Sequence, residues 1–247
     1  MVKVQLIEHT PNPDAVVYYA TRLTYTSDDP LEMWKEIISN KDNPKYQKKM
    51  KKLINTVVRR GHYSVLEHVN FTFIIDGCSR VCTHQLVRHR IASYSQRSHR
   101  YTKIQGTKNM QIPPSIKNDP ELYDLVKKYM NTTIKFYKAL INNGIPQEDA
   151  RFFIPQAVTS PIMVTMNARE LLHFFGLRLC THAQWEIRQA AALMLNEVKK
   201  VAPIIFENAG PRCYILGYCP EEDAKCPVYQ KLFGVNDDIS YKRENKK

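Results

Sequence analysis

The densest group of side chains that could do chemistry lies between Gln85 and Tyr101. Arginine and histidine recur along this segment with an amide and several hydroxyl groups, and no acidic residue stands among them. A guanidinium group can hold two oxygens of one phosphate in a planar fork, which the ammonium group of lysine cannot do. Ile91 and Ala92 lie among the cations, which indicates partial burial. The segment therefore favours an anion-binding site over the alternative, a basic helix end followed by a surface loop.

Two histidines and a glutamate between Gly61 and His68 raise the question of a metal site. His62 and His68 are six residues apart, and the chain contains neither an HExxH motif nor two histidines four residues apart. A helix needs such a spacing to present two imidazoles to one zinc ion. We therefore expect no metal; the histidines would instead cap the preceding helix or hydrogen-bond to a polar ring system.

A third polar group runs from Asn167 to Glu186. Arg169 and His173 are four residues apart, so on a helix they share one face and one ligand can touch both. The alternative is a helix interface whose arginines extend their charged ends to solvent.

The six cysteines bear on both redox state and metal binding. The start of the chain lacks the apolar core and cleavage site of a secretory signal, so we expect a cytoplasmic protein with reduced thiols. Cys213, Cys219 and Cys226 are separated by five and six residues, without the CxxC pairs of zinc ribbons. Zinc is therefore a weak prediction for them, and packed thiols are the favoured one.

Strands and helices alternate along the chain, and they must position these groups. Apolar and polar side chains alternate over 2–7, 69–75 and 162–166, which predicts strands, whereas the serine-rich segment 93–98 is typical of a loop. Helical spacing of apolar residues predicts helices over 30–38, 44–60, 79–90, 120–140, 168–175 and 182–201. The expected fold is one α+β domain over 1–235, with a mixed or antiparallel sheet flanked by helices, and a lysine-rich tail at 236–247.

Several of these helices carry start signals in the sequence. Asp-Pro pairs stand at 29–30 and 119–120, where the carboxylate can cap the helix and proline suits its first turn. Asn167, with Glu170 three residues later, resembles a capping box, and Gly176 is expected to end that helix.

The composition excludes some classes of protein and leaves others open. The 247 residues include 36 Lys and Arg against 24 Asp and Glu, a net charge of +12, and 43% are hydrophobic. Such a chain is too apolar to be disordered, and it has no apolar run of about 20 residues that would span a membrane. Only eight glycines occur, and none form GxGxxG or GxxxxGK[ST]. Phosphates would therefore be held by side chains rather than by a glycine-rich backbone loop.

The segment from Arg88 to Ser98 resembles the signature RHRx7S of the flavin-dependent thymidylate synthases. Its flanks match as well: CSRVCTHQLVRHRIASYSQRSHRY includes the signature, GHYSVLEH precedes it, Ala150-Arg151 with Pro155 follows it, and NARELLHFFGLRLCTHAQWEIR comes last. These blocks stand in the family's order and span about residues 20 to 220.

The resemblance implies an activity and an assembly. Members of this family convert dUMP to dTMP, taking a methylene group from 5,10-methylenetetrahydrofolate and reducing equivalents from NADPH through tightly bound FAD. The resemblance also implies a homotetramer whose sites lie where subunits meet, with the flavin held by side chains from several chains. We expect neither nucleic acid nor a membrane as a partner.

The resemblance assigns two sets of residues, with Arg178 as the catalytic residue that stabilises negative charge on the pyrimidine ring. The nucleotide set, for dUMP, comprises Gln85, Leu86, Val87, Arg88, Gln96, Arg97, Ser98, His99, Arg100, Arg151 and Arg178. The flavin set, for FAD, comprises Thr24, His62, Ser64, Glu67, Arg88, His89, Arg90, Ile91, Gln96, Asn167, Ala168, Arg169 and His173. Some members of the family differ at Thr24, Ser95, Gln96 and His173. Because these residues keep hydrogen-bonding capacity, we expect altered contacts rather than a lost site.

Two other functions remain open on the sequence alone. The charge of +12 would also suit a nucleic-acid-binding protein, with the lysines at 45–52 and the tail as basic arms. A flavoprotein that acts on another nucleotide is the second alternative. Ser98 is a candidate nucleophile by residue type, but no histidine and acid stand at a readable spacing to activate it, so we expect it to bind.

Overall fold

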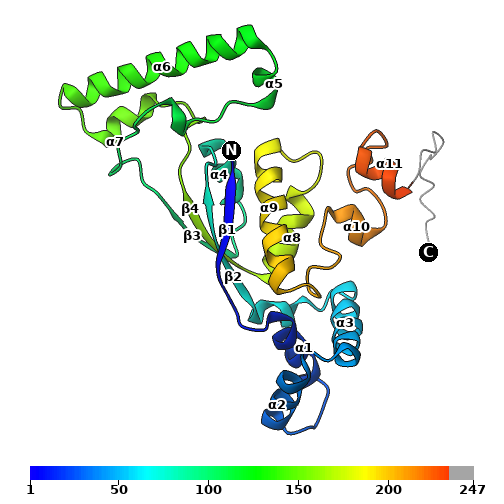
Figure 1. Ribbon diagram of the computed structural model, residues 1–247. Coiled ribbons are helices and arrows are strands. Elements are labelled where there is room, and N and C mark those ends of the chain that lie inside the picture. Colours follow the sequence, from blue (N-terminus) through cyan, green and yellow to red (C-terminus); the bar gives the residue numbers. More distant parts are fainter. Residues whose placement is uncertain (234–247) are drawn as a thin grey trace, which may run out of the picture.

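The computed structural model describes residues 1–233, which build a four-stranded sheet with helices around it (Figure 1). The strands are β1 (Lys3–His9), β2 (Asn70–Asp76), β3 (Ala92–Gln96) and β4 (Ile162–Asn167), in the order β1-β2-β4-β3. Every neighbouring pair is antiparallel. The α+β prediction is confirmed, and the sheet is antiparallel rather than mixed.

One face of the sheet carries the main core. In β2 the side chains of Phe71, Phe73 and Ile75 are fully buried, and the residues between them point to the other face. Two helices, α8 (Ala168–Arg178) and α9 (Trp185–Val201), cover the buried face (Figure 1). On the opposite face the cross-strand neighbours Ile74 and Met163 are exposed.

The N-terminal third forms a helical group at one end of the sheet (Figure 1). It comprises α1 (Pro13–Leu23), α2 (Pro30–Asn40), α3 (Pro44–Arg59) and the short 3-10 helix η1 (Tyr63–His68). Asp29 accepts hydrogen bonds from the N–H groups of Leu31 and Glu32, which confirms the predicted start of α2. Helix α1 has no counterpart among the predicted helices; it begins after Asn12, whose backbone is in the left-handed conformation.

A second, smaller core lies at the other end of the sheet, under the long helix α6 (Pro120–Asn142) (Figure 1). Asp119 caps α6 as predicted. Met130, Ile134 and Tyr137 of α6 pack with Met110 and Val158. The short elements nearby are η2 (Thr107–Asn109), α5 (Pro114–Lys117), α7 (Gln147–Ala150) and η3 (Arg151–Phe153).

Three local predictions were wrong. Residues 93–98 were expected to form a loop, yet β3 covers most of them, because Ser93 and Ser95 pair with Thr165 and Met163 of β4. The helix expected over 79–90 is shorter: α4 comprises Arg80–Leu86. Gly176 does not end its helix but is buried inside α8, where a Cβ atom would lie 3.1 Å from Cγ of Arg212.

The C-terminal part of the described chain contains two short helices, α10 (Arg212–Leu216) and α11 (Pro227–Phe233). The predicted tail at 236–247, and the last two residues of the predicted domain, lie outside the described residues. None of the helices within residues 1–233 combines the length and the apolar character that crossing a bilayer would require.

Candidate functional site

The start of α4 is fixed by a buried carboxylate from α9. Glu186 accepts one hydrogen bond from the backbone N–H of Ser79, at 2.7 Å, and another from its hydroxyl group. Ser79 in turn caps α4 by accepting from the N–H of Cys82 at 3.2 Å. Because Glu186 is 1% exposed, these hydrogen bonds are shielded from water and tie the first turns of two helices together.

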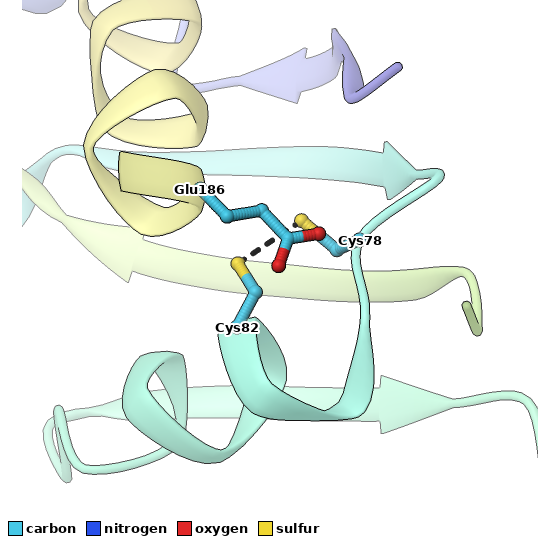
Figure 2. Close-up of side chains that lie close together, drawn as sticks. All are labelled: Cys78, Cys82 and Glu186. Atoms are coloured by element: carbon cyan, nitrogen blue, oxygen red, sulfur yellow. Dashed lines mark hydrogen bonds between the residues drawn. The ribbon is translucent and has the colours of Figure 1, made fainter. Parts of the chain in front are cut away.

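Two thiols lie beside this carboxylate, as Figure 2 shows. The Sγ atoms of Cys78 and Cys82 are 3.2 Å apart, and both residues are fully buried. The hydrogen bond with Cys78, together with burial, raises the pKa of Cys82 above its ordinary value. Cys82 is therefore a neutral thiol that packs and hydrogen-bonds, and not a reactive thiolate.

At the other end of α4, three side chains form a hydrogen-bonded chain. Nδ1 of His89 lies 3.1 Å from Oε1 of Glu170, and Nε of Arg178 lies 3.1 Å from Nε2 of His89. Arg178 also donates to the carbonyl oxygen of Gln85, at 3.4 Å. Because arginine only donates, Nε2 of His89 must accept, which leaves the proton on Nδ1 for Glu170. The imidazole therefore orients Arg178 and is oriented by Glu170.

The electrostatics of this chain keep His89 neutral. Burial, with the charges of Arg178 and His173, lowers the pKa of His89 to about 4. Burial also raises the pKa of Glu170, and this effect outweighs the nearby His173 and Arg169, which lower it. Burial and the neighbouring Arg88 lower the pKa of Arg178, which nevertheless stays protonated. At neutral pH the site thus combines a fixed cation with an uncharged imidazole.

Replacing His89 should change the pH dependence of stability. The folded pKa of about 4 lies below the ordinary 6.5, so between these values only the unfolded chain takes up this proton. Stability due to the neutral imidazole is present above pH 6.5 and is lost as the pH falls toward 4, by up to about 3 kcal/mol. Urea unfolding from pH 7 to 4.5 should show this slope in the wild type and a shallower one in His89→Gln. Equal slopes in both proteins would contradict the assignment.

A cavity of about 410 Å³ opens next to this chain. Glu170 and three members of the flavin set, Ile91, Arg169 and His173, line it together with apolar side chains of Val58, Tyr63, Leu172, Ile215 and Leu216. Arg169 pairs with Glu67, another member of the set, at 2.5 Å. Apolar walls with a few cationic groups suit a planar ring system that carries phosphates. The donor set is therefore compatible with a flavin.

A second group of predicted residues gathers beyond the end of β3. Arg100 pairs with the carboxylate of Glu148 at 2.9 Å, and Arg151 donates to the carbonyl oxygen of the same residue at 3.2 Å. Burial lowers the pKa of His99, and the positive charges of Arg80 and Arg151 lower it further. This group combines several cations with one exposed carboxylate and is suited to bind an anion.

Gln96 links this second group to α4, and Ser98 lies within the group. The amide of Gln96 accepts from Arg80 at 3.1 Å and donates to Thr83 at 3.2 Å. The hydroxyl oxygen of Ser98 accepts from the N–H of Arg100, and no histidine or carboxylate contacts it within residues 1–233. It has no base to activate it as a nucleophile. Arg178, by contrast, contacts Gln85 near the C-terminal end of α4 and His89 just after it.

The side chains of the other predicted residues lie outside the hydrogen-bonded chain and the second group, although Asn167 and Arg88 lie next to the former. Thr24 lies at the end of α1, where its hydroxyl donates to the carbonyl oxygen of Thr21. His62 and Ser64 are exposed at η1, and Arg88 and Arg90 are exposed without an ion pair in the part of the chain that the structure describes. Leu86 is buried, Val87 and Arg97 are exposed, and Asn167 caps α8 just before the buried Ala168.

Three carboxylates that hold the site residues in place were not among the predicted site residues. Glu170 was predicted only as part of a capping box, Glu186 was named only as the end of a polar segment, and Glu148 was not predicted at all. The signal in the sequence was an acid on an apolar helix face: Glu170 precedes Phe174 by four residues, and Glu186 precedes Ala190 by four. All four of these helix residues are buried.

Two other features, a cluster of potential metal ligands and a second cavity, do not change the location of the site. His89, Glu170 and His173 lie within 4.8 Å of one another, but both ring nitrogens of His89 are already hydrogen-bonded. A cavity of about 550 Å³ lies between α1, α3 and the end of α9. None of the residues that line it belongs to the nucleotide set or the flavin set.

Comparison with known proteins agrees with the resemblance in the sequence. The family described as thymidylate synthase complementing protein matches residues 5–204. The flavin-dependent thymidylate synthase of Pyrococcus abyssi is 50% identical over 235 residues, which cover 92% of this chain and 93% of that protein. The enzyme of the same name from Geobacter sulfurreducens is 47% identical over 226 residues, 91% of this chain and 94% of that protein.

The fold has also been seen in a solved structure. The UMP/dUMP methylase PolB from Streptomyces cacaoi, bound with 5-Br dUMP, superposes with a TM-score of 0.69 at 23% identity, covering 84% of this chain and 93% of that chain. This likeness concerns the fold. The family match and the identities extend over nearly the whole sequence, including both groups of clustered residues, and the chain therefore belongs to the flavin-dependent thymidylate synthase family.

Proposed function

We propose that this protein converts dUMP to dTMP, with FAD as its bound cofactor, 5,10-methylenetetrahydrofolate as the one-carbon donor and NADPH as the reductant. Family membership supports the reaction type. The observation that carries the proposal is the hydrogen-bonded chain from Glu170 through His89 to Arg178, which fixes a guanidinium beside the RHR segment. An oriented cation of this kind stabilises negative charge on a pyrimidine ring as carbon 5 becomes nucleophilic.

The residues of this chain divide the work between orientation and binding. Arg178 stays protonated, so it acts by its charge and not as a base. His89 keeps that charge in place while remaining neutral itself. The second group, with Arg100 and Arg151, supplies cations for the phosphate of the nucleotide. Ser98 has no activating partner among the described residues and serves as a hydrogen-bonding group.

The cavity of about 410 Å³ is the proposed position of the flavin. Bound FAD would supply the hydride that completes the methyl group, and the protein would orient it. Arg169 and His173 face this cavity, as their spacing on α8 predicts. The sequence contains no glycine-rich phosphate loop, which agrees with binding of the phosphates of FAD by cationic side chains.

The homotetramer stays a prediction, and the arrangement of the site supports it. The nucleotide set divides into two groups at opposite ends of α4, and Arg88 and Arg90 are exposed without a partner in residues 1–233. A second copy of the chain would complete both halves. The exposed face of the sheet around Ile74 and Met163 offers a surface for contact. The cytoplasmic location likewise stays a prediction.

The experiment that tests the function follows the proton at carbon 5 of dUMP. Purified protein should be yellow after desalting, and it should release tritium from [5-³H]dUMP and form dTMP only with methylenetetrahydrofolate and NADPH present. Retained flavin without tritium release would favour a flavoprotein that acts on another nucleotide. Colourless protein that binds duplex DNA with a steep salt dependence would overturn the proposal.

A further inference from the structure

Two side chains from other elements hold the end of α4. A helix leaves its last carbonyl oxygens without partners inside the helix. At the end of α4, Arg178 of α8 donates to the carbonyl oxygen of Gln85 at 3.4 Å, and Tyr94 of β3 donates to that of Leu86 at 2.9 Å. Arg178 belongs to the nucleotide set, whereas Tyr94 belongs to neither residue set.

The hydroxyl group of Tyr94 joins the two ends of one turn. The turn, at residues 86–89, is closed by a hydrogen bond of 3.1 Å from the N–H of His89 to the carbonyl oxygen of Leu86. The hydroxyl oxygen of Tyr94 is 2.9 Å from this carbonyl oxygen and 2.8 Å from that of His89. Because a phenol has a single proton, the two carbonyl oxygens share it in a three-centre hydrogen bond. One side chain therefore fixes the backbone at both ends of the turn.

The sheet holds the ring of Tyr94 in place. Tyr94 pairs with Val164 of β4, and its ring packs against the main core, whereas Ser93 and Ser95 on either side are exposed. Burial and the charge of Glu170 raise the pKa of Tyr94, so its hydroxyl group keeps its proton at neutral pH. Tyr94 is thus a fixed hydrogen-bond donor to the turn.

The turn carries two groups on which the site depends. Nδ1 and Nε2 of His89 contact Glu170 and Arg178. Arg88 lies close enough to Arg178 to add to the effect of burial in lowering its pKa. Two guanidinium groups at such a separation repel each other until an anion is bound. The repulsion pushes the turn away from α8, and the hydrogen bonds of Tyr94 to the backbone oppose that displacement.

We propose that Tyr94 is a positioning residue for the reaction. Its hydroxyl group anchors the turn at residues 86–89 and so keeps Arg88 and the His89–Arg178 pair in place before dUMP binds. Charges that are in place beforehand need no reorganisation as the reaction proceeds. Tyr94 acts through the turn and needs no contact with the substrate. The role in catalysis rests on the proposed function, whereas the anchoring of the turn does not.

The first test follows the stability of Tyr94→Phe, which lacks the hydroxyl group and keeps the ring in the core. If the turn loosens, His89 loses its fixed contact with Arg178 and meets water, so its folded pKa should rise from about 4 toward 6.5. The folded and unfolded chains then take up this proton over closer pH ranges, and stability depends less on pH. Urea unfolding from pH 7 to 4.5 should therefore give the variant about half the slope of the wild type or less.

The other charged groups around His89 are the same in both proteins. Glu170 and His173 of α8 face the imidazole, and Arg178 stays protonated. Tyr94 does not titrate below pH 7, because its pKa is raised. A change in slope therefore reports on His89, whereas a loss of packing alone would lower stability equally at every pH. Tyr94→Phe combined with His89→Gln should have the same slope as His89→Gln alone.

The second test measures the reaction of the holoenzyme. Tyr94→Phe should lower kcat/KM for dUMP, per bound flavin, about tenfold, as expected for one lost hydrogen bond that positions charge. Tyr19→Phe is the matched control. Tyr19 of α1 also packs partly buried against the main core, but its hydroxyl group has no hydrogen bond within residues 1–233. Its replacement should change neither the slope nor kcat/KM.

Two results would overturn the proposal. A slope equal to that of the wild type would show that Tyr94 contributes packing alone. A reduced slope with unchanged kcat/KM would show that the turn is anchored but that its position does not matter for the reaction. If the wild type forms no dTMP, the proposed function fails, and the slopes still decide whether Tyr94 anchors the turn.

Amide hydrogen exchange of the wild type provides a measurement that does not depend on the folding of Tyr94→Phe. The N–H of His89 should exchange at least about tenfold more slowly than that of Arg90, which has no acceptor within residues 1–233. Equal exchange rates would show that the turn opens freely despite Tyr94, and would overturn the proposal.

Discussion

Arg178→Ala is expected to lower kcat for dTMP formation by about 10²- to 10³-fold while FAD stays bound. The guanidinium is fixed by His89 at 3.1 Å and by the carbonyl oxygen of Gln85 at 3.4 Å, so it needs no reorganisation when charge develops on the substrate. Alanine removes this charge and leaves Nε2 of His89 without its donor. Single-turnover formation of dTMP, with flavin content measured in the same sample, separates the chemical step from cofactor loss.

Arg178→Lys and Lys45→Ala are the matched controls. Lysine at position 178 keeps the positive charge but cannot hold His89 and Gln85 with the geometry of a planar fork, so its activity should fall between those of alanine and wild type. Lys45 is an exposed cation at the start of α3 that belongs to neither residue set and does not line the cavity of about 410 Å³, so its replacement should leave kcat unchanged. If Arg178→Ala turns over within a few-fold of wild type, Arg178 is not the residue that activates dUMP.

The parts of the fold that depend on neighbours in sequence could be predicted well. Asp29 and Asp119 cap their helices through N–H groups two and three residues later, and such signals are local. β3 was missed because its partner β4 lies about 70 residues further along the chain. A serine-rich segment has little strand propensity of its own, and only pairing with β4 makes it a strand.

The types of residue in the site could be predicted from the sequence, but the contacts between them could not. The predicted capping box shows why: Asn167 accepts from the N–H of Glu170 at 2.9 Å, as expected, but the carboxylate of Glu170 turns to His89. The two residues are 81 positions apart, and their contact follows from how α8 packs beside the turn after α4. The cysteines show the same limit, because Cys180 meets Cys213, Cys219 and Cys226 only in the folded chain.

Glu186→Ala should destabilise the protein by about 2–4 kcal/mol and weaken dUMP binding as well. Glu186 is 1% exposed and accepts both hydrogen bonds that Ser79 offers. Alanine leaves a buried N–H and a buried hydroxyl unsatisfied, each at about 1–3 kcal/mol, and detaches the first turn of α4 from α9. Because α4 carries Gln85, whose carbonyl oxygen contacts Arg178, its displacement should raise the KM for dUMP. Urea unfolding gives the free energy, and initial rates give KM.

A double-mutant cycle with Ser79→Ala distinguishes this contact from general damage to the core. Ser79→Ala removes the hydroxyl but keeps the backbone N–H, so it should cost less than Glu186→Ala, and the two changes together should cost less than their sum. Glu186→Gln keeps the shape and one acceptor oxygen and should lose about half as much stability as the alanine variant. Additive effects of Ser79→Ala and Glu186→Ala would show that the two residues act independently. In that case the carboxylate would stabilise α9 alone, and the KM for dUMP should not change.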